Sequence, residues 1–273
     1  MKQVLSVSHK EIWNITYPII FGNLAQTIIV LVNTIFLGHV GTAELGAAMM
    51  AGLYYLVFTT VTQGFAIGVQ IMVARRLGEG NISKIGTIFE HGLAFTVLLG
   101  LSILAFLHFF TAPILGGIIH SQNICSSALK FMDFRQWGII FVSVNYLFRS
   151  LYIGLSNTRI ITYTTLAMAV VNIFFDYSLI FGHFGLPKMG VAGAGLSSVL
   201  AEISACIVFF VYTFGKLPYK DYELFTFKTF DYIFYFNHRS SFVKMRSPNR
   251  IRILELTTAL VLATPTSRAP PRA

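Results

Sequence analysis

Long apolar runs constrain this chain more than any other feature of its sequence. Crossing the hydrocarbon layer of a membrane takes about 20 mostly apolar residues. Six such stretches can be marked off, at about 12–37, 47–73, 88–110, 137–155, 161–184 and 191–214. The chain is 55% hydrophobic and 11% charged, whereas soluble domains carry about 25% charged residues. We therefore predict an all-α integral membrane protein, built as a bundle of six transmembrane helices in the lipid bilayer.

The distribution of basic residues along the chain is typical of a membrane protein. From Asn237 onward the chain holds seven basic residues and one acid, so most of the net charge of +9 lies in this tail, and nucleic-acid binding is not indicated. Basic residues favour cytoplasmic loops, and a cytoplasmic N-terminus puts ten of them inside and three outside. The ten are Lys2, Lys10, Arg75, Arg76, Lys84, Arg149, Arg159, Lys216, Lys220 and Lys228, against Lys130, Arg135 and Lys188. We predict an inner (plasma) membrane protein with both ends of the bundle cytoplasmic.

The chain divides into two parts by composition. Residues 1–236 form the predicted six-helix lobe, and residues 237–273 form a basic tail that ends in Pro and Arg. Two interpretations of the tail stay open: a disordered cytoplasmic segment, or out-of-frame sequence after a truncation.

Neither a metal centre nor an enzyme site is indicated by the spacing of reactive residues. Cys125 and Cys206 are far apart and lack zinc-ligand spacing. His91, His108 and His183 stand singly on separate predicted spans, without an HExxH pattern. We predict no enzymatic activity, no cofactor and no metal, apart from a coupling ion.

Ionisable residues inside a membrane span are costly, so each one is a hypothesis about function. Asp176 lies in the middle of its span, and Asn172, four residues earlier, shares its helix face. Their oxygens are suited to a small cation such as Na⁺, or Asp176 to a proton, because desolvation makes the bare charge costly. Alternatively, the pair holds helices together. Glu202 is a further candidate, whereas Glu90 stands near a span end and is interpreted as structural.

Polar stripes on the first two spans predict surfaces that face protein or water. Gln26 and Asn33 are seven residues apart in the first span, and Gln63 and Gln70 repeat this spacing in the second. Residues seven apart lie on nearly the same face of a helix. These amides, together with Glu202, are candidates for the wall of a substrate cavity.

Four motifs in register resemble the multidrug and toxic compound extrusion (MATE) family. They are VNTIFLGHVGTAELGA (32–47), GVQIMVARRLGEGN (68–81), FRSLYIGLSNTR (148–159) and VNIFFDYSLIFGHFGLPKMGVAGAGLSSV (171–199). The resemblance extends over residues 10 to about 225. It implies a polyspecific exporter, driven by inward Na⁺ or H⁺, with two six-helix lobes around a central cavity.

The resemblance also implies roles for particular residues. Asn172 and Asp176 match the cation-coupling Asn and Asp of the fifth helix, and Ser198 stands at the place of a hydroxyl residue in the sixth. Asn33 stands where the family usually has Asp, and an amide cannot titrate, so more of the coupling falls on Asp176. Family members have twelve helices, so we expect the second lobe to be missing here. The sequence does not identify a partner chain that would supply it.

We expect small amphipathic or cationic drug-like molecules as substrates of a MATE-type antiporter. Two other interpretations remain: a lipid-linked oligosaccharide flippase of related architecture, and a remnant without transport activity. A flippase cavity needs basic residues that bind pyrophosphate. The predicted spans contain almost no basic residue except Arg149, which disfavours the flippase.

Overall fold

The computed structural model describes residues 9–216 and 222–225, which form helices and turns and contain no strand. The helices are α1 (His9–Val40), α2 (Thr42–Gly78), α3 (Ser83–Ile118), α4 (Gln122–Arg135), α5 (Gly138–Gly154), α6 (Arg159–Phe181) and α7 (Val191–Lys216). Five of them are long and apolar enough to cross a membrane, and α5 is a shorter apolar helix. The predicted all-helical membrane fold is confirmed. The predicted boundary at residue 236 and the tail 237–273 lie outside the described residues.

The helices extend beyond the apolar stretches from which they were predicted. α3, for example, continues from Ser83 to Ile118, whereas the apolar stretch is 88–110. Hydropathy marks the part of a helix that lipid surrounds, but the helix ends only where the backbone turns. For α3 this happens at Ile119, whose backbone is extended (φ −95°, ψ 104°).

A separate helix that was not predicted precedes the fourth predicted span. α4 ends at Arg135 and α5 begins at Gly138, with a turn between them. The apolar stretch 137–155 corresponds to α5, and the more polar α4 precedes it. The turn between α4 and α5 is important for the site because Arg135, just before it, lies inside the bundle and pairs with Glu202 of α7.

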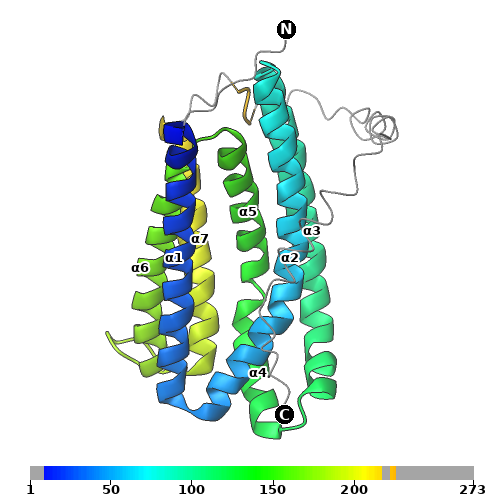
Figure 1. The fold of residues 1–273 in the computed structure, drawn as a ribbon. Coiled ribbons are helices and arrows are strands. Elements are labelled where there is room, and N and C mark those ends of the chain that lie inside the picture. The colour runs from blue at the N-terminus through cyan, green and yellow to red at the C-terminus, as the bar shows by residue number, and fades with distance from the viewer. Residues whose placement is uncertain (1–8, 217–221, 226–273) are drawn as a thin grey trace, which may run out of the picture. The chain divides into compact units, whose positions relative to one another are not determined.

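The helices pack in two groups that α4 and α5 join. α1 packs on α6, and α6 on α7, while α2 contacts α3, α4 and α5. Figure 1 shows α1, α6 and α7 on one flank, α2 and α3 on the other, and α5 between them. Because α4 and α5 both contact α7 as well as α2, they connect the two flanks.

Two glycines let α7 approach its neighbours closely. A Cβ at Gly193 would lie 2.8 Å from the backbone carbonyl of Leu179 in α6, and one at Gly195 would lie 2.5 Å from the carbonyl oxygen of Phe131 in α4. Real side chains do not tolerate such contacts with backbone atoms. The two glycines therefore fix the position of α7, which carries Ser197 and Glu202.

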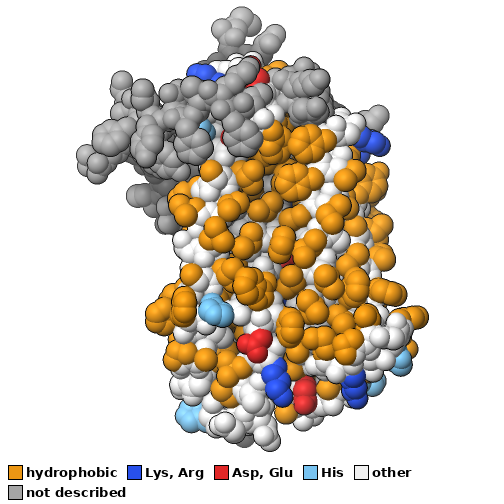
Figure 2. All heavy atoms as spheres, turned by 180° about the vertical axis from the view of Figure 1, so that it is seen from behind, with side chains coloured by type: hydrophobic (Ala, Val, Ile, Leu, Met, Phe, Trp, Pro, Cys, Tyr) orange, Lys and Arg blue, Asp and Glu red, His pale blue; other side chains and the backbone are white. Residues whose placement is uncertain are grey.

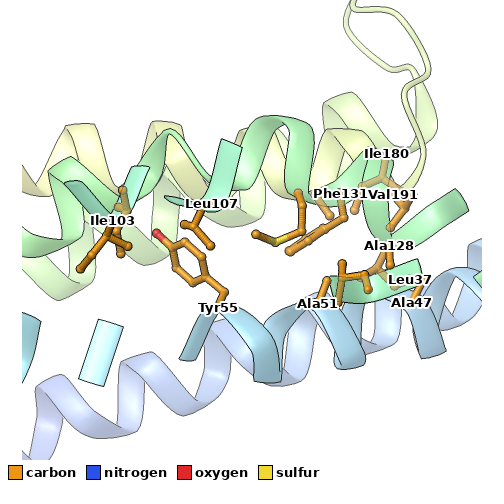
Figure 3. Packing of buried hydrophobic residues seen from close by; sticks show 14 residues of the cluster. Leu37, Ala47, Ala51, Tyr55, Ile103, Leu107, Ala128, Phe131, Ile180 and Val191 are labelled. Atoms are coloured by element: carbon orange, nitrogen blue, oxygen red, sulfur yellow. The ribbon is translucent and has the colours of Figure 1, made fainter. Parts of the chain in front are cut away.

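The core between α2, α3, α4 and α7 combines small and large apolar side chains. Ala51 and Tyr55 project from α2 toward Leu107 and Phe131 (Figure 3). Alanines on the helix faces let the helices approach closely. In a membrane the hydrophobic effect does not drive helices together, so dispersion forces between closely packed helices stabilise the core.

The outer surface is apolar. Large hydrophobic side chains are exposed along the helices, among them Val61, Leu98, Phe109 and Val211. Figure 2 shows such side chains covering one face, with charged side chains mostly near its ends. A surface of this kind suits lipid and not water. The chain is a multi-pass membrane protein.

Candidate functional site

A polar cluster lies where α1, α6 and α7 meet, and Asp176 is its centre. Asp176 is completely buried, and Asn172, one turn earlier on α6, is 1% exposed. Ser197 of α7 donates a hydrogen bond to Asp176 Oδ1. With its amide nitrogen turned toward these acceptors, Asn33 of α1 donates to Asp176 Oδ2 and, at 2.9 Å, to Asn172 Oδ1. Each carboxylate oxygen thus receives a hydrogen bond from a neutral group.

The cluster has the chemistry of a small-cation site. Asp176 forms no ion pair within the part of the chain that the structure describes. A buried charge without an opposite charge is costly, even when neutral groups donate hydrogen bonds to it. Carboxylate, amide and hydroxyl oxygens are the ligands that hard cations such as Na⁺ prefer, and a carboxylate also takes a proton. Uptake of either ion would remove the uncompensated charge.

The hydroxyl that reaches Asp176 belongs to Ser197, whereas the sequence pointed to Ser198. Ser198 donates to the carbonyl oxygen of Ala194 at 3.0 Å and lines the neighbouring cavity. Adjacent residues of a helix point about 100° apart, so the choice depends on how α7 is rotated. The signal for Ser197 is Gly193, one turn earlier on the same face, since that face must approach α6 closely.

A cavity of about 500 Å³ lies beside the cluster, between α1, α2, α4, α6 and α7. Five predicted site residues line it. They are Gln26, Asn33, Asn172, Ser198 and Glu202. Most of the remaining wall is apolar and includes Met49, Met168 and Phe131. Asp176 itself does not line the cavity, whereas its hydrogen-bond partner Asn33 and the neighbouring Asn172 do.

A second cavity of about 390 Å³ adjoins the first. The two share Gln26, Tyr55, Arg135 and Glu202 among their lining residues. Gln63 lines the second cavity, as predicted for a cavity-wall residue, whereas Gln70 lines neither. The polar stripe of α2 therefore faces a cavity along only part of its length.

Glu202 is held by an ion pair that sequence reasoning missed. Arg135 donates to both of its carboxylate oxygens, at 2.9 Å from Nη1 and 2.6 Å from Nη2. The guanidinium also lies over the Tyr55 ring, 4.0 Å from its centroid, and its side chain is only 14% exposed. The prediction that Arg135 lies in an external loop is wrong. The guanidinium of Arg135 lies inside the bundle because the turn between α4 and α5 directs this side chain toward α7.

Comparisons with known proteins find sequence relatives that match most of this chain. The family model MatE matches residues 18–178. A probable multidrug resistance protein NorM from Agrobacterium fabrum is 30% identical over 209 residues, 76% of this chain and 44% of that protein. One from Bacillus subtilis is 29% identical over 217 residues, 79% of this chain and 48% of that protein. This chain spans about half the length of these curated relatives.

Solved structures show the same arrangement of helices. A MOP superfamily transporter from Pyrococcus furiosus has a TM-score of 0.71 at 18% identity, covering 77% of this chain and 45% of its own. A MATE in the bent conformation has a TM-score of 0.69 at 18% identity, with coverages of 77% and 46%. At this identity the likeness concerns the fold. The described bundle corresponds to somewhat less than half of each solved chain.

Proposed function

The chain belongs to the MatE family, as its four motifs predicted, and on that premise we propose that it takes part in exporting drug-like organic molecules by antiport with Na⁺ or H⁺. The names of its relatives support the drug-export part, since they are probable multidrug resistance proteins. We propose further that the two cavities form one wall of a larger binding space, which a second six-helix lobe completes.

The observation that carries the proposal is the uncompensated carboxylate of Asp176. It is fully buried, its partners Ser197 and Asn33 are neutral, and Asn33 and the neighbouring Asn172 line a cavity that a drug-sized molecule fits. An ion that binds Asp176 changes the charge next to these lining residues. Coupling requires that the ion bind one conformation of the bundle more tightly than another, and the cluster joins three helices whose packing such binding can bias.

The proposed substrates are amphipathic organic cations. The apolar wall of the first cavity, with Met49, Met168 and Phe131, supports this class because polarisable side chains adapt to varied shapes. The location we propose is the inner membrane, with both ends of the bundle cytoplasmic. Arg75, Arg76 and Lys84, where α2 ends and α3 begins, support this orientation.

The substitution Asp176→Asn tests the ion site. It keeps the shape of the side chain and removes the charge. We expect the melting temperature of the purified chain in nanodiscs to rise when Na⁺ replaces choline at constant pH, or when the pH falls without Na⁺. A site saturated at 100 times its Kd adds about 2.7 kcal/mol. Asp176→Asn should abolish the dependence, whereas Asn33→Asp, which adds a second carboxylate to the cluster, should strengthen it.

A matched control is Asp133→Asn. Asp133 is exposed on α4 and lines neither cavity, so this variant should retain the ion dependence of the unmodified chain. If Asp176→Asn retains it too, the cluster is structural and the proposed coupling site is wrong. The response to Na⁺ at constant pH also distinguishes Na⁺ coupling from H⁺ coupling.

A further inference from the structure

Arg149 lies beside the second cavity and has no acidic partner among the residues that the structure describes. Its guanidinium donates to the amide oxygen of Asn23 at 3.1 Å, and it forms no ion pair with any residue that the structure describes. Arginine stays protonated in proteins. A neutral amide satisfies one of its five N–H donors and leaves its charge uncompensated.

The wall of the second cavity carries a net positive charge. Its ionised side chains are Arg149, Arg135 and Glu202. Because Arg135 binds both carboxylate oxygens of Glu202, these two charges cancel and the charge of Arg149 remains. The first cavity lacks Arg149, and its charged lining residues, Arg135 and Glu202, are the same ion pair, so the net positive charge lies at the end of the joined cavities that Arg149 lines.

Further hydrogen-bond donors surround this end. The amides of Gln26 and Gln63 line the cavity with Arg149, while Val142, Met168 and Phe209 provide apolar wall. Charge-assisted hydrogen bonds from a guanidinium to a carboxylate or sulfonate are about twice as strong as neutral ones. We propose that Arg149 is the centre of a subsite for an anionic group, a carboxylate or sulfonate, on an amphipathic molecule whose apolar part lies in the joined cavities.

This inference rests on the proposed export function and widens its substrate class from organic cations to molecules that carry an acidic group. Two dyes with a common xanthene ring system test it. Sulforhodamine B carries sulfonates, and rhodamine 6G is a cation. Binding of both to the purified chain in nanodiscs is measured by fluorescence anisotropy at fixed ionic strength.

We expect Arg149→Gln to weaken sulforhodamine B binding about tenfold or more, the loss of a charge-assisted bond, and to leave rhodamine 6G binding unchanged or tighter. Arg149→Lys keeps the charge and should stay close to the unmodified chain. The matched control is Arg159→Gln, at the exposed first residue of α6 and outside both cavities, which should change neither dye.

Gln63→Glu tests the same subsite with Arg149 in place. The new carboxylate adds a negative charge to the cavity wall, so it should weaken sulforhodamine B and favour rhodamine 6G even if Arg149→Gln does not fold. The subsite is wrong if either variant that folds leaves the ratio of the two affinities unchanged. If rhodamine 6G binds the unmodified chain and sulforhodamine B does not, the subsite alone is refuted. If neither dye binds, both the subsite and the proposed export function are refuted.

Discussion

Two buried carboxylates of this bundle have opposite surroundings. Asp176 on α6 is held by the hydroxyl of Ser197 and the amide of Asn33, both neutral. Glu202 on α7 is held by the guanidinium of Arg135 at two points. Burial is nearly the same, at 0% and 5% exposure, so the partners make the difference. Arg135 balances the charge of Glu202, whereas Asp176 forms no ion pair with any residue that the structure describes, as the coupling site that we propose requires.

The comparison predicts that the two carboxylates differ in what their removal does. A buried ion pair adds little net stability, because desolvation of both charges offsets their attraction, but removal of one partner leaves a bare charge. Loss of Arg135 should therefore affect folding, whereas loss of the Asp176 charge should affect ion binding. The following predictions test this division, beginning with the largest effect.

Arg135→Ala should be strongly destabilising, by about 3–5 kcal/mol, because it leaves Glu202 buried without its cation. The measurement is the midpoint of thermal unfolding in detergent, followed by tryptophan fluorescence. The double variant Arg135→Met with Glu202→Leu removes both charges and should recover most of the loss. A single variant as stable as the double variant would show that Glu202 finds solvent or another partner, and would break the comparison.

Gly138→Ala should be the next largest change, at about 1–3 kcal/mol. A Cβ at this first residue of α5 would overlap both Arg135 Nη1 and Glu202 Oε2 and would lie 3.3 Å from Val199 Cγ2, so the ion pair must shift. Thermal unfolding measures the loss. Gly68→Ala on α2, where a Cβ meets nothing within 4 Å, is the control and should be neutral or slightly stabilising. Equal behaviour of the two variants would mean that the ion pair adjusts without cost.

Ser197→Ala and Ser198→Ala sharpen the other side of the comparison. Ser197 donates to Asp176, while Ser198 donates to the carbonyl oxygen of Ala194. Loss of one neutral hydrogen bond amounts to about 1 kcal/mol, so Ser197→Ala should change the ion concentration at half-maximal stabilisation about fivefold. Ser198→Ala should leave it unchanged. The opposite result, with Ser198 sensitive and Ser197 not, would place the hydroxyl of the site one residue later than the structure does.

The sequence predicted what depends on local spacing. Asn172 and Asp176 share a helix face at any rotation of α6, so their proximity follows from a separation of four residues. The pairing of Arg135 with Glu202 joins positions 67 residues apart and depends on the turn between α4 and α5. A lone arginine before an apolar stretch is indistinguishable in sequence from a loop residue. The choice of Ser197 over Ser198 depends in the same way on the rotation of α7, which packing determines.

The smallest expected effect is at the exposed ion pair that ends α2. Arg75 Nε and Arg76 Nη1 lie 2.8 and 2.6 Å from the oxygens of Glu79, whose side chain is 38% exposed. Hydrogen bonds from Arg75, and then Arg76, lower the pKa of Glu79. Water screens such pairs, and a carboxylate at the C-terminal end of a helix opposes the helix dipole. Glu79→Gln should therefore lower the melting temperature at pH 7 only slightly, by less than Arg135→Ala or Gly138→Ala.

The pH dependence of this difference has a definite sign. Because the pKa of Glu79 is lower in the folded chain, any stability from the pair is present above the unfolded pKa of about 4.3 and is lost as the pH falls through the folded value. The melting temperatures of the unmodified chain and Glu79→Gln should thus converge in acid and at high salt. A loss at pH 7 as large as that of Arg135→Ala would show that an arginine–carboxylate pair stabilises this bundle wherever it lies. Burial would then not explain why Arg135 and Glu202 matter.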